Sequence, residues 1–167
     1  MKHIKVSLFL LSLCLLTACT GNQESNKDIM TTNETHIETG IIAEQVLAGE
    51  TSEIHYSYYL PKTYDENKQY PLMMIMPGYD MMWFGEDSSG SNISWNGFQA
   101  WTKLDEDMIV VSAQLTDWQE TSANQAIELT EYFIDNFTVN LKRVYAGGYS
   151  AGGETMSQAV SMRPDLY

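Results

Sequence analysis

The sequence predicts an α/β fold in which a mostly parallel β-sheet is flanked by helices. Three short apolar runs, at 72–76, 108–112 and 143–147, have the length and composition of strands that are buried on both faces. Segments with helical spacing separate and follow these runs, and such alternation favours a parallel sheet with helices on both faces. The third run leads directly into a glycine-rich motif around Ser150.

Residues 1–18 have the features of a bacterial secretory signal. Lys2, His3 and Lys5 form a basic region, and the apolar stretch 6–16 is too short to span a bilayer stably. The stretch ends in Leu16-Thr17-Ala18-Cys19, which resembles the lipobox of bacterial lipoproteins. Cleavage before Cys19 would leave that cysteine to carry a lipid, whereas an ordinary secretory signal with an incidental cysteine is the alternative.

Polar residues dominate from Gly21 to about Thr39, which is typical of a flexible tether. We therefore expect a tether at 19–39 and a folded domain at 40–167, held outside the cytoplasm by a membrane anchor. The only other cysteine, Cys14, lies in the signal, so the mature domain is predicted to have neither a disulfide nor a thiolate metal cluster.

The chain is strongly acidic, with a formal net charge of −13. Removal of residues 1–18 leaves 7 basic residues against 22 acidic ones, a formal charge of −15. Such a surface repels phosphate backbones, so nucleic-acid binding is excluded as a function class.

Two antiparallel strands are expected first, at 40–47 and 53–60. In the second, apolar or aromatic residues alternate at Ile54, Tyr56, Tyr58 and Leu60, as in a half-buried strand. A polar turn then leads to the buried strand at 72–76.

A long loop is expected from Tyr79 to about Asn96, and loops of this length usually serve a site. A short helix at 97–104 and the strand at 108–112 follow. Ser122-Ala123-Asn124-Gln125 has the form of a capping box, so a helix is predicted to begin there. Its buried face is predicted to hold Ala126, Ile127, Thr130, Phe133, Ile134 and Phe137. The last helix, 151–162, is expected to end before Pro164.

Gly148-Tyr149-Ser150-Ala151-Gly152 has the G-x-S-x-G pattern of a nucleophile elbow, in which a serine occupies a tight turn between a strand and a helix. The turn needs small neighbours, which Gly148, Ala151 and Gly152 supply. A position at a helix N-terminus also directs backbone amides toward developing negative charge. We therefore predict that Ser150 is a catalytic nucleophile.

A serine nucleophile of this kind needs an oxyanion hole made of two backbone N–H groups. Ala151, the residue after the nucleophile, is expected to supply one of them. The other is expected from Tyr79, because Pro77-Gly78 directly follows a buried strand and Gly78 lets the backbone approach closely.

Simpler interpretations stand beside these predictions. The motif could be a glycine-serine turn of an unrelated α/β protein, and Pro77-Gly78 an ordinary turn. His36 and His55 are not convincing as catalytic bases, and Asp105-Glu106-Asp107 is expected to be a solvated turn rather than a metal site. Residues 81–84 are expected to pack in the core and loop, with a role at the border of a substrate cleft as the alternative.

The sequence resembles the secreted α/β-hydrolase esterases, in particular polyhydroxybutyrate depolymerases and feruloyl esterases, with prolyl-oligopeptidase-type peptidases as neighbours. The resemblance rests on Leu60-Pro61, Tyr64-Asp65, Lys68, Tyr70-Pro71-Leu72, Pro77-Gly78, the run 143–153 and Pro164-Asp165-Leu166. It covers about residues 54–167, the N-terminal portion of the usual catalytic domain. It implies an eight-stranded, mostly parallel sheet and hydrolysis through an acyl-enzyme without a metal or other cofactor.

The chain departs from this pattern in two respects. Pro77-Gly78 stands where the family usually has His-Gly, and no histidine follows Ser150. The acid and histidine of the triad follow the nucleophile in this fold, so we expect a domain truncated after the elbow and inactive alone.

We therefore predict a serine hydrolase acting on small-molecule or polymeric carboxylic esters. A serine peptidase of the prolyl-oligopeptidase type is one alternative. The other is a non-catalytic surface lipoprotein that uses a hydrolase-like fold for binding.

Overall fold

The computed structural model describes residues 37–82 and 92–167. The predicted signal, Cys19, His36 and nearly all of the predicted tether lie outside these residues. Within them, no helix combines the length and the apolar composition needed to cross a membrane.

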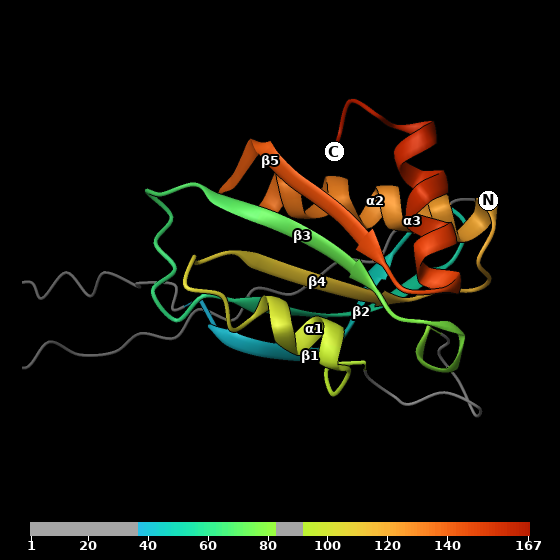
Figure 1. Cartoon of the computed structure of the whole chain (residues 1–167). Coiled ribbons are helices and arrows are strands. Elements are labelled where there is room, and N and C mark those ends of the chain that lie inside the picture. The colour runs from blue at the N-terminus through green and yellow to red at the C-terminus, as the bar shows by residue number, and fades with distance from the viewer. Residues whose placement is uncertain (1–36, 83–91) are drawn as a thin grey trace, which may run out of the picture. The chain divides into compact units, whose positions relative to one another are not determined.

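A five-stranded mixed sheet forms the centre of the fold, in the order β1-β2-β4-β3-β5 (Figure 1). The strands are β1 (Gly40–Ala48), β2 (Glu53–Leu60), β3 (Tyr70–Met76), β4 (Ile109–Gln114) and β5 (Val139–Gly148). The last three are mutually parallel, and β1 and β2 extend the sheet as an antiparallel pair. This arrangement confirms the predicted α/β class.

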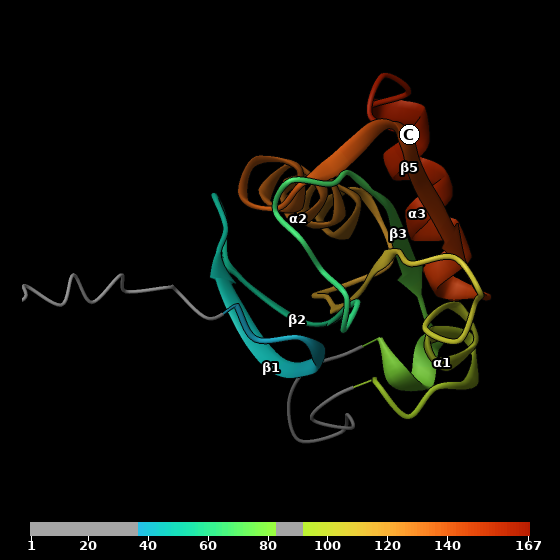
Figure 2. The same ribbon diagram turned by 90° about the vertical axis from the view of Figure 1, so that its left-hand side faces the viewer.

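Helices cover both faces of the sheet (Figure 2). The short helix α1 (Asn96–Trp101) packs on one face against β3 and β4. On the other face α2 (Glu120–Asn136) and α3 (Ala151–Met162) pack against each other and against the parallel strands. A single 3₁₀ turn, η1 (Tyr79–Met81), follows β3.

Alternation along β3 divides the core into two parts. Leu72, Met74 and Met76 face α2 and α3, whereas Met73 and Ile75 belong to the smaller cluster around α1. All seven residues of β3 are buried, as the continuous apolar run predicted for a strand covered on both faces.

Helix α2 does not begin at the predicted capping box. It starts at Glu120, so Ser122 lies inside the first turn. The Asp117 carboxylate accepts hydrogen bonds from the backbone N–H groups of Gln119 (2.9 Å) and Ser122 (3.1 Å), and the Ser122 hydroxyl accepts one from the Asp117 N–H (2.8 Å). The cap therefore comes from Asp117, outside the helix, which satisfies N–H groups that lack a partner within it.

The other predicted bounds shift modestly. Helix α1 is shorter than the predicted 97–104, and β5 is longer than the predicted 143–147. The prediction that 143–147 is buried on both faces was wrong: only Val144 is buried there, because β5 lies at the edge of the described sheet and pairs with β3 alone. Within the predicted loop 79–96, η1 takes the first three residues, and residues 83–91 lie outside the described part of the chain.

Candidate active site

Ser150 lies in the turn between β5 and α3, at the N-cap of the helix. Its backbone has φ 52° and ψ −126°, a conformation that only glycine adopts without strain. Glu44, in a β-bulge of β1, is the only other non-glycine residue with positive φ in the described part of the chain. A strained serine between a strand and a helix is the geometry that the G-x-S-x-G pattern predicted.

Contact distances explain why glycine flanks the turn. A Cβ atom at Gly152 would lie 2.1 Å from the carbonyl oxygen of Pro77 and 2.7 Å from that of Met76. A Cβ atom at Gly148 would lie 2.5 Å from the backbone of Gly152. Helix α3 can therefore approach the end of β3 only because these positions lack side chains.

The end of β3 lies directly beside the elbow. The Tyr149 N–H donates to the Met76 carbonyl oxygen (3.0 Å), which extends the β3–β5 ladder up to the serine. A Cβ atom at Gly78 would lie 3.0 Å from Cδ1 of Tyr149 and 3.6 Å from Cβ of Ser150. The segment that follows Gly78 therefore borders the Ser150 side chain.

Two backbone N–H groups begin helical turns beside Ser150. Ala151 is the first residue of α3, and Tyr79 is the first residue of η1. The N–H groups of a helix's first turn point away from its body and carry the positive end of the helix dipole. Ala151 and Tyr79 thus each begin a helical turn close to Ser150, and their contribution to an oxyanion hole stays a prediction.

A cavity of about 330 Å³ opens at this place. Its lining consists of Gly78, Tyr79, Asp80, Met81, Trp95, Tyr149 and Ser150. The ring of Tyr79 also contacts Trp118 edge to face, at a centroid distance of 5.4 Å. The cavity therefore combines a hydroxyl group, aromatic rings and one carboxylate.

Trp95 and Asp80 were not singled out from the sequence. Trp95 precedes α1, where its N–H donates to the carbonyl oxygen of Asn92 (3.1 Å) and its ring lies over Gly97. A Cβ atom at Gly97 would lie 2.4 Å from that ring, so glycine leaves room for it. The Trp-Asn-Gly sequence was the only available sign of this packing.

The remaining predicted residues lie away from Ser150 or have structural contacts. His55 lies in β2, which β4 and β3 separate from β5. Three strand spacings amount to ~14 Å, far beyond hydrogen-bond reach. Its Nε2 lies 3.7 Å from a carboxylate oxygen of Glu53.

The acidic turn 105–107 has structural partners. Glu106 forms a two-point ion pair with Arg143, at 2.5 and 2.7 Å, and the Thr63 hydroxyl donates to Asp107. No group of three potential metal ligands occurs within the described residues. Met82 is fully buried and its carbonyl oxygen accepts from the Leu115 N–H (2.7 Å), whereas Trp83 and Phe84 lie outside the described residues.

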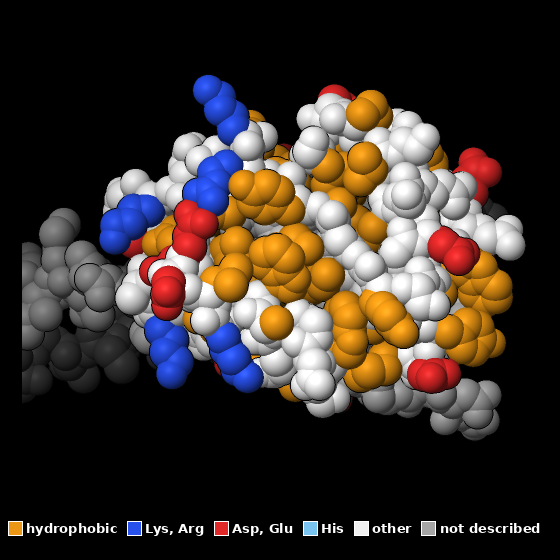
Figure 3. All heavy atoms as spheres, in the orientation of Figure 1, with side chains coloured by type: hydrophobic (Ala, Val, Ile, Leu, Met, Phe, Trp, Pro, Cys, Tyr) orange, Lys and Arg blue, Asp and Glu red, His pale blue; other side chains and the backbone are white. Residues whose placement is uncertain are grey.

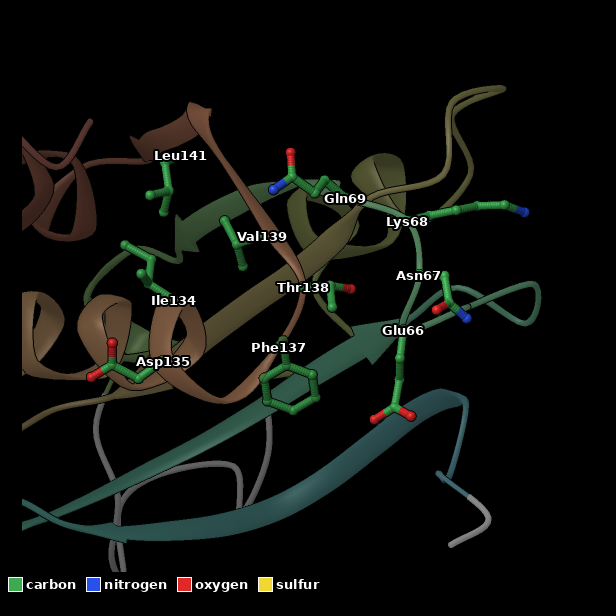
Figure 4. A pocket seen from close by; sticks show the side chains of 10 residues that line it. All are labelled: Glu66, Asn67, Lys68, Gln69, Ile134, Asp135, Phe137, Thr138, Val139 and Leu141. Carbon is green, nitrogen blue, oxygen red and sulfur yellow. The ribbon is translucent and has the colours of Figure 1, made fainter. Parts of the chain in front are cut away.

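A second cavity, of about 580 Å³, lies at the opposite ends of the parallel strands (Figure 4). Its side chains come from the segment 66–69, the end of α2 and the start of β5. The Tyr70 N–H donates to the Thr138 carbonyl oxygen (2.8 Å) nearby and so joins the beginnings of β3 and β5. Ser150 does not line this cavity, which is therefore separate from the site at the elbow.

Residues 112–167 match the family model described as the prolyl oligopeptidase family. The matched segment runs from β4 through the elbow and α3, and so includes Ser150. No curated protein matches the chain.

Solved structures share the fold at low sequence identity. A thermostable esterase has a TM-score of 0.62 and 20% identity, over 74% of this chain and 38% of its own. Oligopeptidase B from Leishmania major has a TM-score of 0.56 and 18% identity, over 77% of this chain and 19% of its own. The ferulic acid esterase AmCE1/Fae1A from Anaeromyces mucronatus has a TM-score of 0.53 and 21% identity, over 81% of this chain and 59% of its own.

The chain thus spans between about a fifth and three fifths of the length of these structures. The TM-scores of 0.53 to 0.62 establish the shared fold despite identities near 20%. The family match over residues 112–167 agrees with this fold.

Proposed function

Because the chain has the α/β-hydrolase fold, we propose that it contributes the nucleophile and the oxyanion hole of a serine hydrolase that acts on carboxylic esters. One observation carries the proposal: a strained serine at the N-cap of α3 lines a cavity together with the Gly78-Tyr79 turn. A fold keeps a conformation that costs about 1–3 kcal/mol only where the surrounding packing enforces it, and such strain is concentrated at functional sites.

In the proposed reaction the Ser150 oxygen attacks the ester carbonyl while a histidine takes the hydroxyl proton. The carbonyl oxygen becomes an oxyanion that accepts hydrogen bonds from the N–H groups of Ala151 and Tyr79. Collapse of the tetrahedral intermediate breaks the ester C–O bond, and the histidine returns its proton to the leaving alcohol. Water then attacks the acyl-enzyme in the same way and releases the carboxylic acid.

The general base must come from a residue other than His55, which lies about three strand spacings from β5. In α/β-hydrolases the acid and then the histidine follow the nucleophile along the chain. The proposal therefore requires an Asp or Glu and a His after Tyr167 in the full-length protein. The partial coverage of the solved esterases agrees with this requirement.

Peptide hydrolysis is the second candidate function, and the match of residues 112–167 to the prolyl oligopeptidase family favours it. Both reactions use the same nucleophile and oxyanion hole, so the described residues do not separate them. Paired substrates that differ only in an ester or an amide bond will do so.

The test is labelling of the full-length protein by a fluorophosphonate probe, which reacts with activated serines. We expect labelling that Ser150→Ala abolishes and that Ser157→Ala leaves intact, because Ser157 lies on the exposed face of the same helix. Absence of labelling, or labelling that persists in Ser150→Ala, would contradict the proposal and favour the non-catalytic alternative.

We also propose that Cys19 carries a lipid and anchors the domain outside the cytoplasm. The apolar stretch 6–16 and the small residues before Cys19 support this assignment. Such an anchor would bring the domain to ester substrates that reach the cell surface.

A further inference from the structure

Exposed aromatic side chains gather around the proposed site. Each parallel strand is followed within five residues by one of them: Tyr79 after β3 is 54% exposed, Trp118 after β4 is 37% exposed, and Tyr149 after β5 is 67% exposed. Tyr79 and Tyr149 line the cavity at Ser150, and Trp95 adds a third ring to its lining. The faces of aromatic rings carry negative charge density and attract cations, including the ammonium groups of ligands.

The same cavity contains a carboxylate, Asp80, in η1. Asp80 follows Gly78 by two residues, and the Gly78 carbonyl oxygen accepts from the Met81 N–H (3.0 Å), so the turn is tight. The exposed Asp80 lines the same small cavity as Ser150 and so places a negative charge at the site.

Charged residues are distributed unevenly between the two ends of the sheet. Six described residues with ionised side chains lie in or beside the turns at the end where the parallel strands stop. All six are acidic: Glu50, Glu53, Asp80, Asp117, Glu120 and Glu154. The described Lys and Arg residues lie elsewhere, near the starts of β3, β4 and β5 or after the last turn of α3: Lys62, Lys68, Lys103, Lys142, Arg143 and Arg163. In Figure 3 the blue side chains accordingly lie at one end of the visible face and only red charged side chains at the other.

A negative environment opposes the reaction proposed for Ser150. The tetrahedral intermediate gains a negative charge, and a nearby carboxylate raises its energy unless a positive charge compensates. No Lys or Arg of the described residues lines the cavity. A cationic group on the substrate would supply the compensation and would also bind the ring faces.

We propose that the site takes esters that carry an ammonium group in the alcohol or the acyl part, a specificity that rests on the proposed hydrolase function. Asp80 and the rings of Trp95 and Tyr149 hold the ammonium group, while Ser150 attacks the ester carbonyl. The positive charge lowers the energy of the oxyanion as it forms, so the preference is expressed in kcat/KM as well as in binding.

The kinetic test compares esters with their uncharged carbon isosteres, in which a quaternary carbon replaces the ammonium nitrogen. One pair is acetylthiocholine and its isostere; the other is the nitrophenyl ester of trimethylammoniobutanoate and its isostere. For the full-length protein we expect a kcat/KM about two- to fivefold higher for the cationic member of one pair or both, the scale of a cation–π contact at an exposed site. The preference should largely disappear in Asp80→Asn and at high salt, and it should persist in Asp105→Asn, the matched change in the turn before β4.

A binding measurement keeps the inference testable without turnover. Choline should quench tryptophan fluorescence at a lower concentration than its carbon isostere, and Asp80→Asn should remove the difference. Equal binding and equal kcat/KM within both pairs would overturn the inference, while labelling at Ser150 would leave the proposed hydrolase function standing. If the protein bound choline preferentially but was not labelled at Ser150, the proposed hydrolase function would be refuted and only the proposed ammonium-binding site would be supported.

Discussion

The approach of α3 to the end of β3 depends on Gly152, and its replacement by alanine gives a sharp test of the elbow geometry. The added methyl group would lie 2.1 Å from the Pro77 carbonyl oxygen and 2.7 Å from both Cβ and the carbonyl oxygen of Met76. Backbone atoms of a buried strand end cannot rotate away as a flexible side chain can. The helix must therefore shift, and the hydrogen bonds of the elbow shift with it.

Gly153 provides a matched control in the same helical turn. A Cβ atom there would lie 3.2 Å from the Gly148 carbonyl oxygen and 3.4 Å from the Gly148 carbonyl carbon, a tight contact that needs only a few tenths of an ångström of movement. Alanine also favours the helix over glycine by up to ~1 kcal/mol. We expect Gly152→Ala to cost about 3 kcal/mol through overpacking and Gly153→Ala to stay within about 1 kcal/mol of the parent.

Both variants of the full-length protein should be compared by urea unfolding, by thermal unfolding and by fluorophosphonate labelling. At ~2–4 °C per kcal/mol, Gly152→Ala should melt about 6–12 °C lower, and labelling should slow because Ser150 moves away from Gly78 and Tyr79. If Gly152→Ala kept the parent's stability and labelling rate, or if both alanine variants lost equal stability, the close approach would not be what positions the serine.

Three further predictions concern other features of the chain. Ser150→Gly should be about 1–2 kcal/mol more stable to urea than Ser150→Ala, because only glycine relieves the strain at φ 52°; equal stability would argue against the strain. Burial opposes ionisation of Asp117, but hydrogen bonds from Gln119 and from the side chain and backbone of Ser122 outweigh it and lower its pKa. The carboxylate thus stabilises the fold above about pH 4 and loses this effect as the pH falls further. Asp117→Ala should lower the free energy of unfolding by about 1 kcal/mol at neutral pH and should make the loss of stability below about pH 4 less steep. An unchanged loss of stability at acid pH would contradict the assignment. Globomycin, or Cys19→Ser, should block processing of the precursor, and unaltered processing would refute the lipoprotein assignment.

Much of the fold is encoded in local patterns. Strand β2 and helix α3 have the predicted bounds, 53–60 and 151–162. The alternation of apolar and polar residues marks β2, and the elbow glycines and Pro164 mark the two ends of α3, so each signal lies within a few residues of the element it defines. The start of α2 was misplaced since two cues compete there. A capping box at Ser122 is a sequence-local pattern, whereas the actual cap depends on how Asp117 leaves β4 and reaches across to two N–H groups.

The residues of the candidate site likewise fall into those that the sequence predicts and those that it does not. The positions of Ser150, Ala151 and Tyr79 just after β5 and β3 could be predicted because the glycine-containing turns that follow these strands are local sequence patterns. Their catalytic roles stay predictions. The positions of Trp95 and Asp80 in the cavity could not be predicted, since they depend on contacts between residues far apart in the sequence. Local sequence patterns do not contain such contacts, which form only when η1, the start of α1 and the elbow meet at one end of the sheet.

The close contacts at Gly148, Gly152 and Gly78 link the two halves of the proposed site. Helix α3 touches the Met76 and Pro77 carbonyl oxygens, and the chain emerges from that contact at Gly78 and Tyr79. One backbone approach therefore affects both the conformation of Ser150 and the distance from Ser150 to Tyr79, the second proposed oxyanion donor. A substitution that widens the approach is therefore expected to impair the proposed nucleophile and the proposed oxyanion hole together. A change confined to the Tyr79 side chain, such as Tyr79→Phe, should leave the backbone donor in place.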